Sequence, residues 1–588
     1  MSMGRRSSLA LLAAAAVLAA PVAAGAAPYR HQIQATARGT GGAAASVDKT
    51  ATDAAIRILR RGGNAVDAAV AAAAVLGVVE PYSCGIGGGG FMVVRLPNGR
   101  VTTIDSREKA PAAMQPGSFF ENGAALPFTA ARYSGLSAGV PGTVRAWTFA
   151  LRRFGSRKLA TLLRPAIAVA RNGFVVDQTF FDQTTPNIPY FDDLPATKAL
   201  YLDADGTPRD VGSTLQNPDM ARTLRRIGRL GANGFYRGPV AAAIAKAVQA
   251  PPTGPGADQT WRPGLMTQTD LRRYSARERR PTRIAYRGLD IFSMGPPSSG
   301  GTTVGEALNI LEQVQNYPLL PETDKLHYFL EASRYAFADR NAYLGDPSFS
   351  DVPVATLLSD SFAASRRAAI TDTAANATVP PAAIATPPTT GTAAVSRPDQ
   401  STTHLTVADA NGMVVSYTFT IESTGGNGIV VPGWGFLLNN ELTDFTYTAT
   451  TGPNRAEGNK RPRSSIAPTY VEREGQPFLA VGSPGGASII TTVLQVLTQR
   501  IDFGRALPEA IAVPRASQRN GPTSEPEQAF LDTYGAALQA APFSQAFGTP
   551  AAELGAVTAI EFAPRGVLLA AAEPVRRGGG NAQVVSAE

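Results

Sequence analysis

Thr402 is the residue whose type and position best suit nucleophilic chemistry, because it opens a strongly patterned stretch of the chain. A threonine hydroxyl is a weak nucleophile unless a base lies beside it. If the chain is cut directly before Thr402, the new α-amine is such a base, since a pKa of about 7.7–8.0 leaves much of it neutral near physiological pH. The alternative is that Thr402 is one threonine among many on a solvated strand.

The segment before Thr402 has the composition of a flexible tether. From residue 372 to 400 the chain consists largely of Ala, Thr and Pro, with few large apolar side chains. Such a stretch cannot bury enough apolar surface to order itself. We therefore expect 372–400 to be flexible and to move away from the site after a cut between Ser401 and Thr402.

The residues after the cut predict a β-hairpin. Positions 402–409 and 413–422 alternate in polarity around a turn at Asn411 and Gly412. With a three-residue loop at 410–412, Thr402 faces Thr420, whereas a two-residue turn would shift this register by one. One face is then a core face of Thr403, Leu405, Val407, Val415, Tyr417, Phe419 and Ile421. The other is rich in hydroxyls and comprises Thr402, His404, Thr406, Val414, Ser416, Thr418 and Thr420.

The rest of the chain predicts mixed helix and strand. Residues 51–60 and 64–79 have helical patterns broken by Gly62 and Gly63, and an apolar strand is expected over 91–95. The glycine run 85–90 lies between helix and strand and is followed by no Gly-Lys-Ser/Thr. It therefore indicates close backbone packing rather than nucleotide binding. A further helix is expected over 325–342.

Composition excludes several classes of protein. The chain has 588 residues and 44% hydrophobic residues, enough for a large core, and shows no repeat. Its formal charge of +8 is carried by scattered Lys and Arg, which argues against nucleic-acid binding. A single cysteine, Cys84, forms no internal disulfide, and the three histidines do not match a zinc-binding pattern. No metal or cofactor is implied.

The N-terminus has the pattern of a secretory signal peptide. Arg5 and Arg6 precede an apolar stretch over 9–20, and residues 24–26 fit a cleavage site after Ala26. Removal of 1–26 leaves no membrane span, so we expect a periplasmic or secreted protein. The arginine pair leaves open whether export is general or twin-arginine, and an uncleaved anchor is the alternative. The apolar run 66–79 is too short to span a membrane and carries Asp67.

Eight segments in order resemble the γ-glutamyltranspeptidase family. The hairpin 402–422 is similar to the family signature. The other segments are DSRE with AP (105–111), GVPGT (139–143), PPSSGG (296–301), AFADR (336–340), LNN with DF (438–445), KRP with SS (460–465) and GSPGG (482–486). The resemblance implies the N-terminal-nucleophile αββα sandwich. It also implies a large subunit, 27–401, and a small subunit, 402–588, that stay together as a heterodimer.

The resemblance also implies roles for individual residues. Thr402 would cleave the Ser401–Thr402 bond and then act as nucleophile, contacted by Thr420. The amides of Gly485 and Gly486 would form the oxyanion hole. Arg107, Ser464 and Ser465 would hold the donor's α-carboxylate, and Glu441, Asp444 and Glu422 its α-ammonium. The activity implied is transfer of a γ-glutamyl group from glutathione or a related donor to an amino acid, a peptide or water, without cofactor.

Some positions depart from the family pattern, and two other functions stay open. Glu422 and Glu441 stand where some members carry neutral amides, and the short stretch between Asp444 and Ser464 predicts no long lid over the site. A cephalosporin acylase of the same fold would cleave glutaryl amides, which lack an α-ammonium to pair with Asp444 and Glu441. An exported binding protein without catalytic activity would have no use for Thr402 at a cut site.

Overall fold

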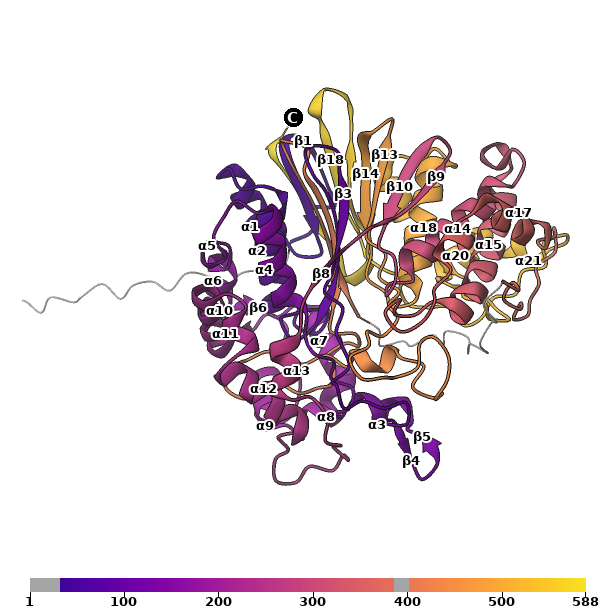
Figure 1. Ribbon diagram of the computed structural model, residues 1–588. Coiled ribbons are helices and arrows are strands. Elements are labelled where there is room, and N and C mark those ends of the chain that lie inside the picture. The colour runs from indigo at the N-terminus through magenta and orange to yellow at the C-terminus, as the bar shows by residue number, and fades with distance from the viewer. Residues whose placement is uncertain (1–31, 385–400, 588) are drawn as a thin grey trace, which may run out of the picture.

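The structure is a computed structural model that describes residues 32–384 and 401–587. Two stacked β-sheets lie between two layers of helices, as Figure 1 shows. The expected signal peptide 1–26 and residues 385–400 of the expected tether lie outside the described residues. The four-layer αββα sandwich expected from the sequence is confirmed.

Both sheets are antiparallel, and each combines strands from before and after Thr402. The first has the order β8 (Arg277–Arg279), β3 (Val101–Asp105), β2 (Gly89–Arg95), β12 (Val414–Thr420), β11 (Thr403–Asp409), β1 (Thr36–Ser46) and β19 (Asn581–Ala587). The second has the order β18 (Leu568–Ala572), β17 (Thr558–Phe562), β14 (Gln476–Gly482), β13 (Thr469–Arg473), β10 (Leu289–Ser293) and β9 (Thr282–Tyr286).

Strand β1 connects the two sheets. Its residues 42–45 pair with β11 in the first sheet, while residues 36–39 pair with β18 in the second. Strand β19 pairs with residues 39–46 of β1 along its other edge. The two sheets are therefore continuous in hydrogen bonding along one edge of the sandwich.

Helices cover the outer face of each sheet (Figure 1). The first layer contains α1 (Lys49–Arg60), α2 (Ala65–Val79), α4 (Thr143–Phe154), α6 (Arg164–Asn172), α10 (Pro218–Leu230) and α12 (Pro239–Gln249). The second contains α14 (Gly300–Glu312), α15 (Glu322–Tyr343), α17 (Asp360–Ala368) and α18 (Ser488–Ile501). The helices predicted over 51–60, 64–79 and 325–342 correspond to α1, α2 and α15.

Helix α2 is buried along its whole length, which explains why its sequence is apolar all round. Asn64 caps its N-terminus and forms a capping box with Asp67, so that both polar groups are satisfied. Over the described residues, we find no helix whose length and apolar character would suffice to cross a bilayer.

The hairpin of β11 and β12 has the register predicted for a three-residue loop. Thr403 pairs with Phe419, and the Asp409 amide donates to the carbonyl of Met413 across the turn. The apolar face packs into the core below α2. The hydroxyl face is buried as well, because it packs on the second sheet: the Thr406 hydroxyl donates to the carbonyl of Thr558. The alternative of a solvated strand is therefore wrong.

His404 fills the space between the two sheets on this face. Its ring nitrogens lie 2.7 Å from Thr418 Oγ1 and 3.1 Å from Thr406 Oγ1. Burial lowers the pKa of His404 to about 3, so the ring is neutral. Gly482 on β14 lies against the ring, and a Cβ at that position would be 2.3 Å from His404 Cε1. The imidazole is thus a packed part of the interior.

Two further expectations concern segments without regular structure. The glycine run packs closely as predicted, since a Cβ on Gly88 would lie 1.8 Å from the carbonyl oxygen of Thr420. The expected flexibility of 372–400 is wrong for residues 372–384. These residues are held by hydrogen bonds from backbone amides to side chains, such as those from Val379 N to Asn520 Oδ1 (2.8 Å) and from Ala382 N to Asp339 Oδ1 (2.7 Å). Burial of Val379 in the core of the second layer adds to this polar anchoring.

Candidate active site

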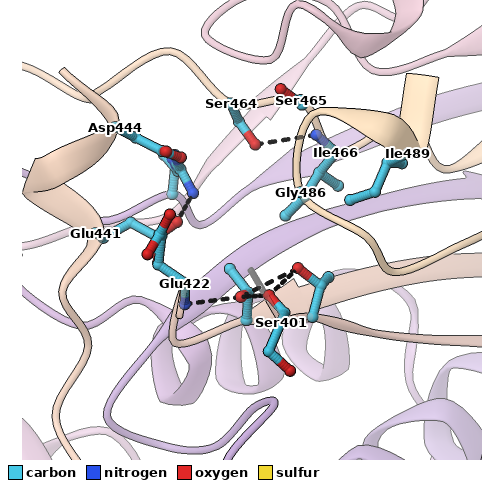
Figure 2. A pocket seen from close by; sticks show the side chains of 12 residues that line it. Ser401, Glu422, Glu441, Asp444, Ser464, Ser465, Ile466, Gly486 and Ile489 are labelled. Atoms are coloured by element: carbon cyan, nitrogen blue, oxygen red, sulfur yellow. Dashed lines mark hydrogen bonds and ion pairs between the residues drawn. The ribbon is translucent and has the colours of Figure 1, made fainter. Parts of the chain in front are cut away.

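A pocket of about 300 Å³ gathers residues that are far apart in the sequence. Its lining comprises Arg107, Ser401, Thr402, Thr420, Glu422, Glu441, Asp444, Ser464, Ser465, Ile466, Gly486 and Ile489. Ten of these are sequence-predicted site residues, and the apolar Ile466 and Ile489 are additions. Gly485 is the one predicted site residue that does not line the pocket, although it adjoins Gly486. Figure 2 shows the acidic side chains on one side and the two serines on the other.

Thr402 lies at the pocket edge, directly before β11, and is 3% exposed. Its hydroxyl donates to the carbonyl of Ser401 and lies 3.3 Å from the hydroxyl of Thr420. Thr420, at the end of β12, donates to the same Ser401 carbonyl at 2.9 Å. This arrangement follows from the hairpin register, which places 402 opposite 420. Two hydroxyls therefore converge on the carbonyl of the bond expected to be cut.

The residues on either side of this bond are anchored. The Ser401 amide donates to the carbonyl of Glu422 at 2.9 Å, and the Ser401 hydroxyl lies 2.8 Å from Ser83 Oγ. Arg577 donates from Nη1 to the carbonyl oxygen of Thr402 at 2.7 Å. Sequence reasoning missed Arg577, because nothing near it in the sequence indicates a contact with a residue 175 positions away.

Gly485 and Gly486 form a turn directly before α18. Both have positive φ, 131° and 56°, a region that glycine adopts without a Cβ clash. Among the hydrogen bonds of the described residues, neither glycine amide is a donor. Both amides lie at the start of α18, where the helix dipole favours negative charge. The turn therefore has the composition and position of an anion-binding site.

The acidic side of the pocket is built around Arg107. Its guanidinium pairs with Glu441 through Nη1 and with Asp444 through Nη2, and it also donates to the carbonyls of Pro462 and Arg463. Glu441 and Asp444 lie on one short helix, η3 (Glu441–Asp444). The resemblance assigned Arg107 to a carboxylate and the two acids to an ammonium. In the structure these groups pair with one another.

Glu108 is a buried carboxyl beside this cluster that sequence reasoning quoted only as part of a motif. It is fully buried, and its two oxygens accept no hydrogen bond from the described residues. One of them lies 4.0 Å from Arg107 Nη1. Burial raises the pKa of Glu108 to about 8, opposed by the positive charge of Arg107. Burial likewise raises the pKa of Glu441, with Arg107 acting in the opposite direction.

Glu422 follows β12 and is 5% exposed. Its amide donates to Thr420 Oγ1 at 2.8 Å, which fixes that hydroxyl as an acceptor there and a donor to Ser401. Its carboxylate accepts from Ser423 Oγ and Asn440 Nδ2. Glu422 therefore links the geometry of Thr420 to the acidic side of the pocket.

The opposite side of the pocket carries Ser464 and Ser465. Ser464 Oγ accepts from the amide of Ile466 at 3.1 Å, and Ser465 Oγ accepts from Arg340 Nη2 at 2.7 Å. The chain between Asp444 and Ser464 folds back on itself, with Asn454 Nδ2 donating to the Asp444 carbonyl at 2.8 Å. The pocket thus presents carboxylates on one side and, on the other, two hydroxyls, one of which is backed by the Arg340 guanidinium. This arrangement suits a zwitterionic ligand.

The four-layer fold, with a threonine directly before β11, is that of the N-terminal-nucleophile hydrolases. The family model for Gamma-glutamyltranspeptidase matches residues 51–583. The chain belongs to the gamma-glutamyltranspeptidase family. It is therefore an enzyme of the hydrolase and acyltransferase class.

Individual relatives fall in two groups. The chain is 37% identical over 527 residues to a glutathione hydrolase proenzyme from Escherichia coli, covering 87% of each chain. It is 35% identical over 545 residues to an Acylase ACY 1 proenzyme from Pseudomonas sp., covering 91% of this chain and 92% of the relative. The crystal structure of a cephalosporin acylase from Bacillus halodurans is similar with a TM-score of 0.79 at 28% identity, covering 97% of this chain and 99% of that chain.

Proposed function

We propose that this protein is an exported γ-glutamyltransferase and glutathione hydrolase that matures by cutting itself before Thr402. One observation carries the proposal: the Thr402 and Thr420 hydroxyls converge on the Ser401 carbonyl at the edge of a pocket with an acidic side and a hydroxyl side. The first feature supports self-cleavage, and the second supports recognition of an amino-acid head group.

Maturation begins with attack of Thr402 Oγ1 on the carbonyl carbon of Ser401. The hydroxyl proton passes to the amide nitrogen as the C–N bond breaks, which leaves an ester between Ser401 and Thr402 Oγ1. Donation from Thr420 to the carbonyl oxygen stabilises the negative charge that develops there. Water then hydrolyses the ester and leaves Thr402 with a hydroxyl and an α-amine.

The mature nucleophile repeats this chemistry on the donor. The α-amine accepts the Thr402 hydroxyl proton as Oγ1 attacks the γ-carbonyl, and the amides of Gly485 and Gly486 hold the developing oxyanion. The proton passes to the leaving amine as the C–N bond breaks, giving a γ-glutamyl ester on Thr402. Water or the amine of an amino acid or peptide then takes the acyl group and restores the hydroxyl.

Recognition of the donor uses both sides of the pocket. Glu422, Glu441 and Asp444 receive the α-ammonium, and Ser464 and Ser465 donate to the α-carboxylate together with Arg107. Arg107 already neutralises part of the charge of Glu441 and Asp444. The charged groups of the donor therefore replace contacts within an existing ion-pair network. They do not enter a pocket whose charges are unpaired.

We further propose a heterodimer of residues 27–401 and 402–588, located in the periplasm or outside the cell. The interleaving of strands from both segments in each sheet supports a pair that stays together after the cut. The proenzyme names of the relatives support processing. Export rests on the signal-peptide pattern of residues 1–26.

The second candidate is a glutaryl acylase, favoured by the similarity to the cephalosporin acylase structure and the ACY 1 relative. The two functions differ in the need for an α-ammonium. Purified mature protein is assayed for initial rates on γ-glutamyl anilide and glutaryl anilide, with and without a dipeptide acceptor. A preference for γ-glutamyl supports the proposal, and a preference for glutaryl supports the acylase. A chain that stays uncut and turns over neither donor would support the binding-protein alternative.

A further inference from the structure

Two of the segments that resemble the family have no role in the mechanism above, and they meet behind Ser465. Ser299 belongs to the 296–301 segment and Arg340 to the 336–340 segment on α15. The guanidinium of Arg340 donates from Nε to Ser299 Oγ at 2.9 Å and from Nη2 to Ser465 Oγ at 2.7 Å. Ser299 Oγ in turn donates to the carbonyl of Ser464 at 2.6 Å. A single network thus connects both segments to the serine side of the pocket.

Arg340 differs from its neighbours in lacking a carboxylate partner. It is 4% exposed, and within residues 32–384 and 401–587 it forms no ion pair. Nearby, Arg334 pairs with Glu331 and Arg366 with Asp339. Burial of an arginine without a counter-ion is costly, and here burial and the adjacent Arg463 lower the pKa of Arg340. The negative charge of Asp444, which forms no ion pair with Arg340, opposes this shift. An anionic ligand bound in the pocket would further stabilise the charged guanidinium.

The hydrogen bonds also fix the direction of the serine hydroxyls. Arginine can only donate, so Ser465 Oγ must accept from Arg340, and its own hydrogen remains available to a ligand. Ser464 Oγ similarly accepts from the Ile466 amide. Both hydroxyls can therefore donate to an anion in the pocket.

We propose that Arg340 is a positioning residue that turns the Ser465 hydroxyl toward the donor's α-carboxylate and supplies positive charge behind it. The proposal rests on the proposed γ-glutamyl specificity. Arg107 alone gives little net positive charge for binding a carboxylate, because Glu441 and Asp444 already pair with its guanidinium. No carboxylate of the described residues forms an ion pair with Arg340, which contributes through Ser465 without touching the substrate.

The test compares three anilide donors that differ by one group each. The γ-glutamyl donor has both head-group charges, the glutaryl donor lacks the α-ammonium, and the 4-aminobutyryl donor lacks the α-carboxylate. Arg340→Met is expected to lower kcat/KM for the two carboxylate donors by about tenfold or more, mainly through KM, because a charge-assisted contact is lost. The 4-aminobutyryl donor should lose less than about twofold. Arg340→Lys should recover part of the loss.

Controls separate this role from a structural one. Arg367→Met removes a cation from α17 in the same helical layer, away from the pocket, and should change no donor's kinetics. Competitive inhibition by glutamate and by 4-aminobutyrate gives the same comparison without turnover. An equal loss on all three donors, or no loss on the carboxylate donors, would overturn the proposal. Absence of γ-glutamyl turnover by the unmutated protein would instead overturn the proposed function.

Discussion

The hydroxyl of Thr402 lies 3.3 Å from that of Thr420, and both point to the carbonyl oxygen of Ser401. The pair is set by the hairpin, whose register places the residue directly before β11 beside the last residue of β12. The proposed nucleophile and the group proposed to polarise its target therefore come from a single supersecondary unit. Helices and loops from elsewhere in the chain add the pocket around it.

Thr402→Ala should remain a single chain, because the attacking hydroxyl is absent. Intact mass of the purified protein measures this, and the unmutated chain should give two fragments, the smaller beginning at Thr402. Thr403→Val is the matched control, since Thr403 points into the opposite face and its hydroxyl has no partner among the described residues. Cleavage of the alanine variant at the same bond would contradict the assignment of the nucleophile.

Thr420→Val should cut itself about 100-fold more slowly, the scale of losing one oxyanion-stabilising donor. The valine keeps the shape of the side chain but cannot donate to the Ser401 carbonyl. The fraction of uncut chain, followed on denaturing gels over time, gives the rate. Thr420→Ser should restore cleavage, and a valine variant that matures at the normal rate would remove Thr420 from the mechanism.

Glu441→Gln should weaken discrimination between γ-glutamyl and glutaryl donors by about tenfold or more, since a charged contact to the α-ammonium is lost. The same change leaves Arg107 with one carboxylate fewer, so the glutaryl donor should bind better than in the unmutated protein. The ratio of kcat/KM for the two donors is the readout. An unchanged ratio would mean that the ammonium is recognised elsewhere.

Glu108→Gln should change how thermal stability depends on pH. The folded-state pKa of Glu108 is raised to about 8, so between the unfolded value of about 4.5 and pH 8 the folded chain holds one proton more than the unfolded chain. The contribution of Glu108 to the free energy of unfolding therefore decreases as the pH rises through this range. The Tm of Glu108→Gln relative to the unmutated protein should rise from pH 5 to pH 9, and a constant difference would argue against a perturbed carboxyl.

Gly482→Ala should destabilise the fold by about 2 kcal/mol or more, because the new methyl group meets the buried ring of His404 between the sheets. Thermal unfolding of the two proteins at one pH measures the change. Gly117→Ala is the control, since nothing lies within 4 Å of its added Cβ. Equal Tm values for the two variants would show that the sheets can separate to admit the methyl group.

The sequence predicted the hairpin because alternation and a turn define register locally. Thr402 and Thr420 could therefore be paired without knowledge of the rest of the fold. The same alternation could not reveal what packs on the hydroxyl face, since β14 and β17 come from residues 476–482 and 558–562. A strand pattern describes polarity, and a polar face can still be buried when its hydroxyls find backbone carbonyls.

The pairing of charged side chains in the pocket could also not be predicted from the sequence. Arg107 and Glu441 are 334 positions apart, and the motif residues alone do not show that they contact each other before a ligand arrives. The order in 372–384 was missed for a related reason. It rests on hydrogen bonds to side chains such as Asn520 and Asp339, which composition does not report.

The strand order has a consequence for how the mature enzyme can be made. Strand β1, from before the cut, lies between β11 and β19, from after it, and also pairs with β18. Two separately synthesised segments would have to pair these strands with each other while neither segment could form a complete sheet by itself. The uncut chain avoids that search because its parts are tethered while they fold. The intact link between the two segments thus guides assembly, and its cleavage comes after the sheets have formed. Once separated and unfolded, the two segments would not readily reassemble.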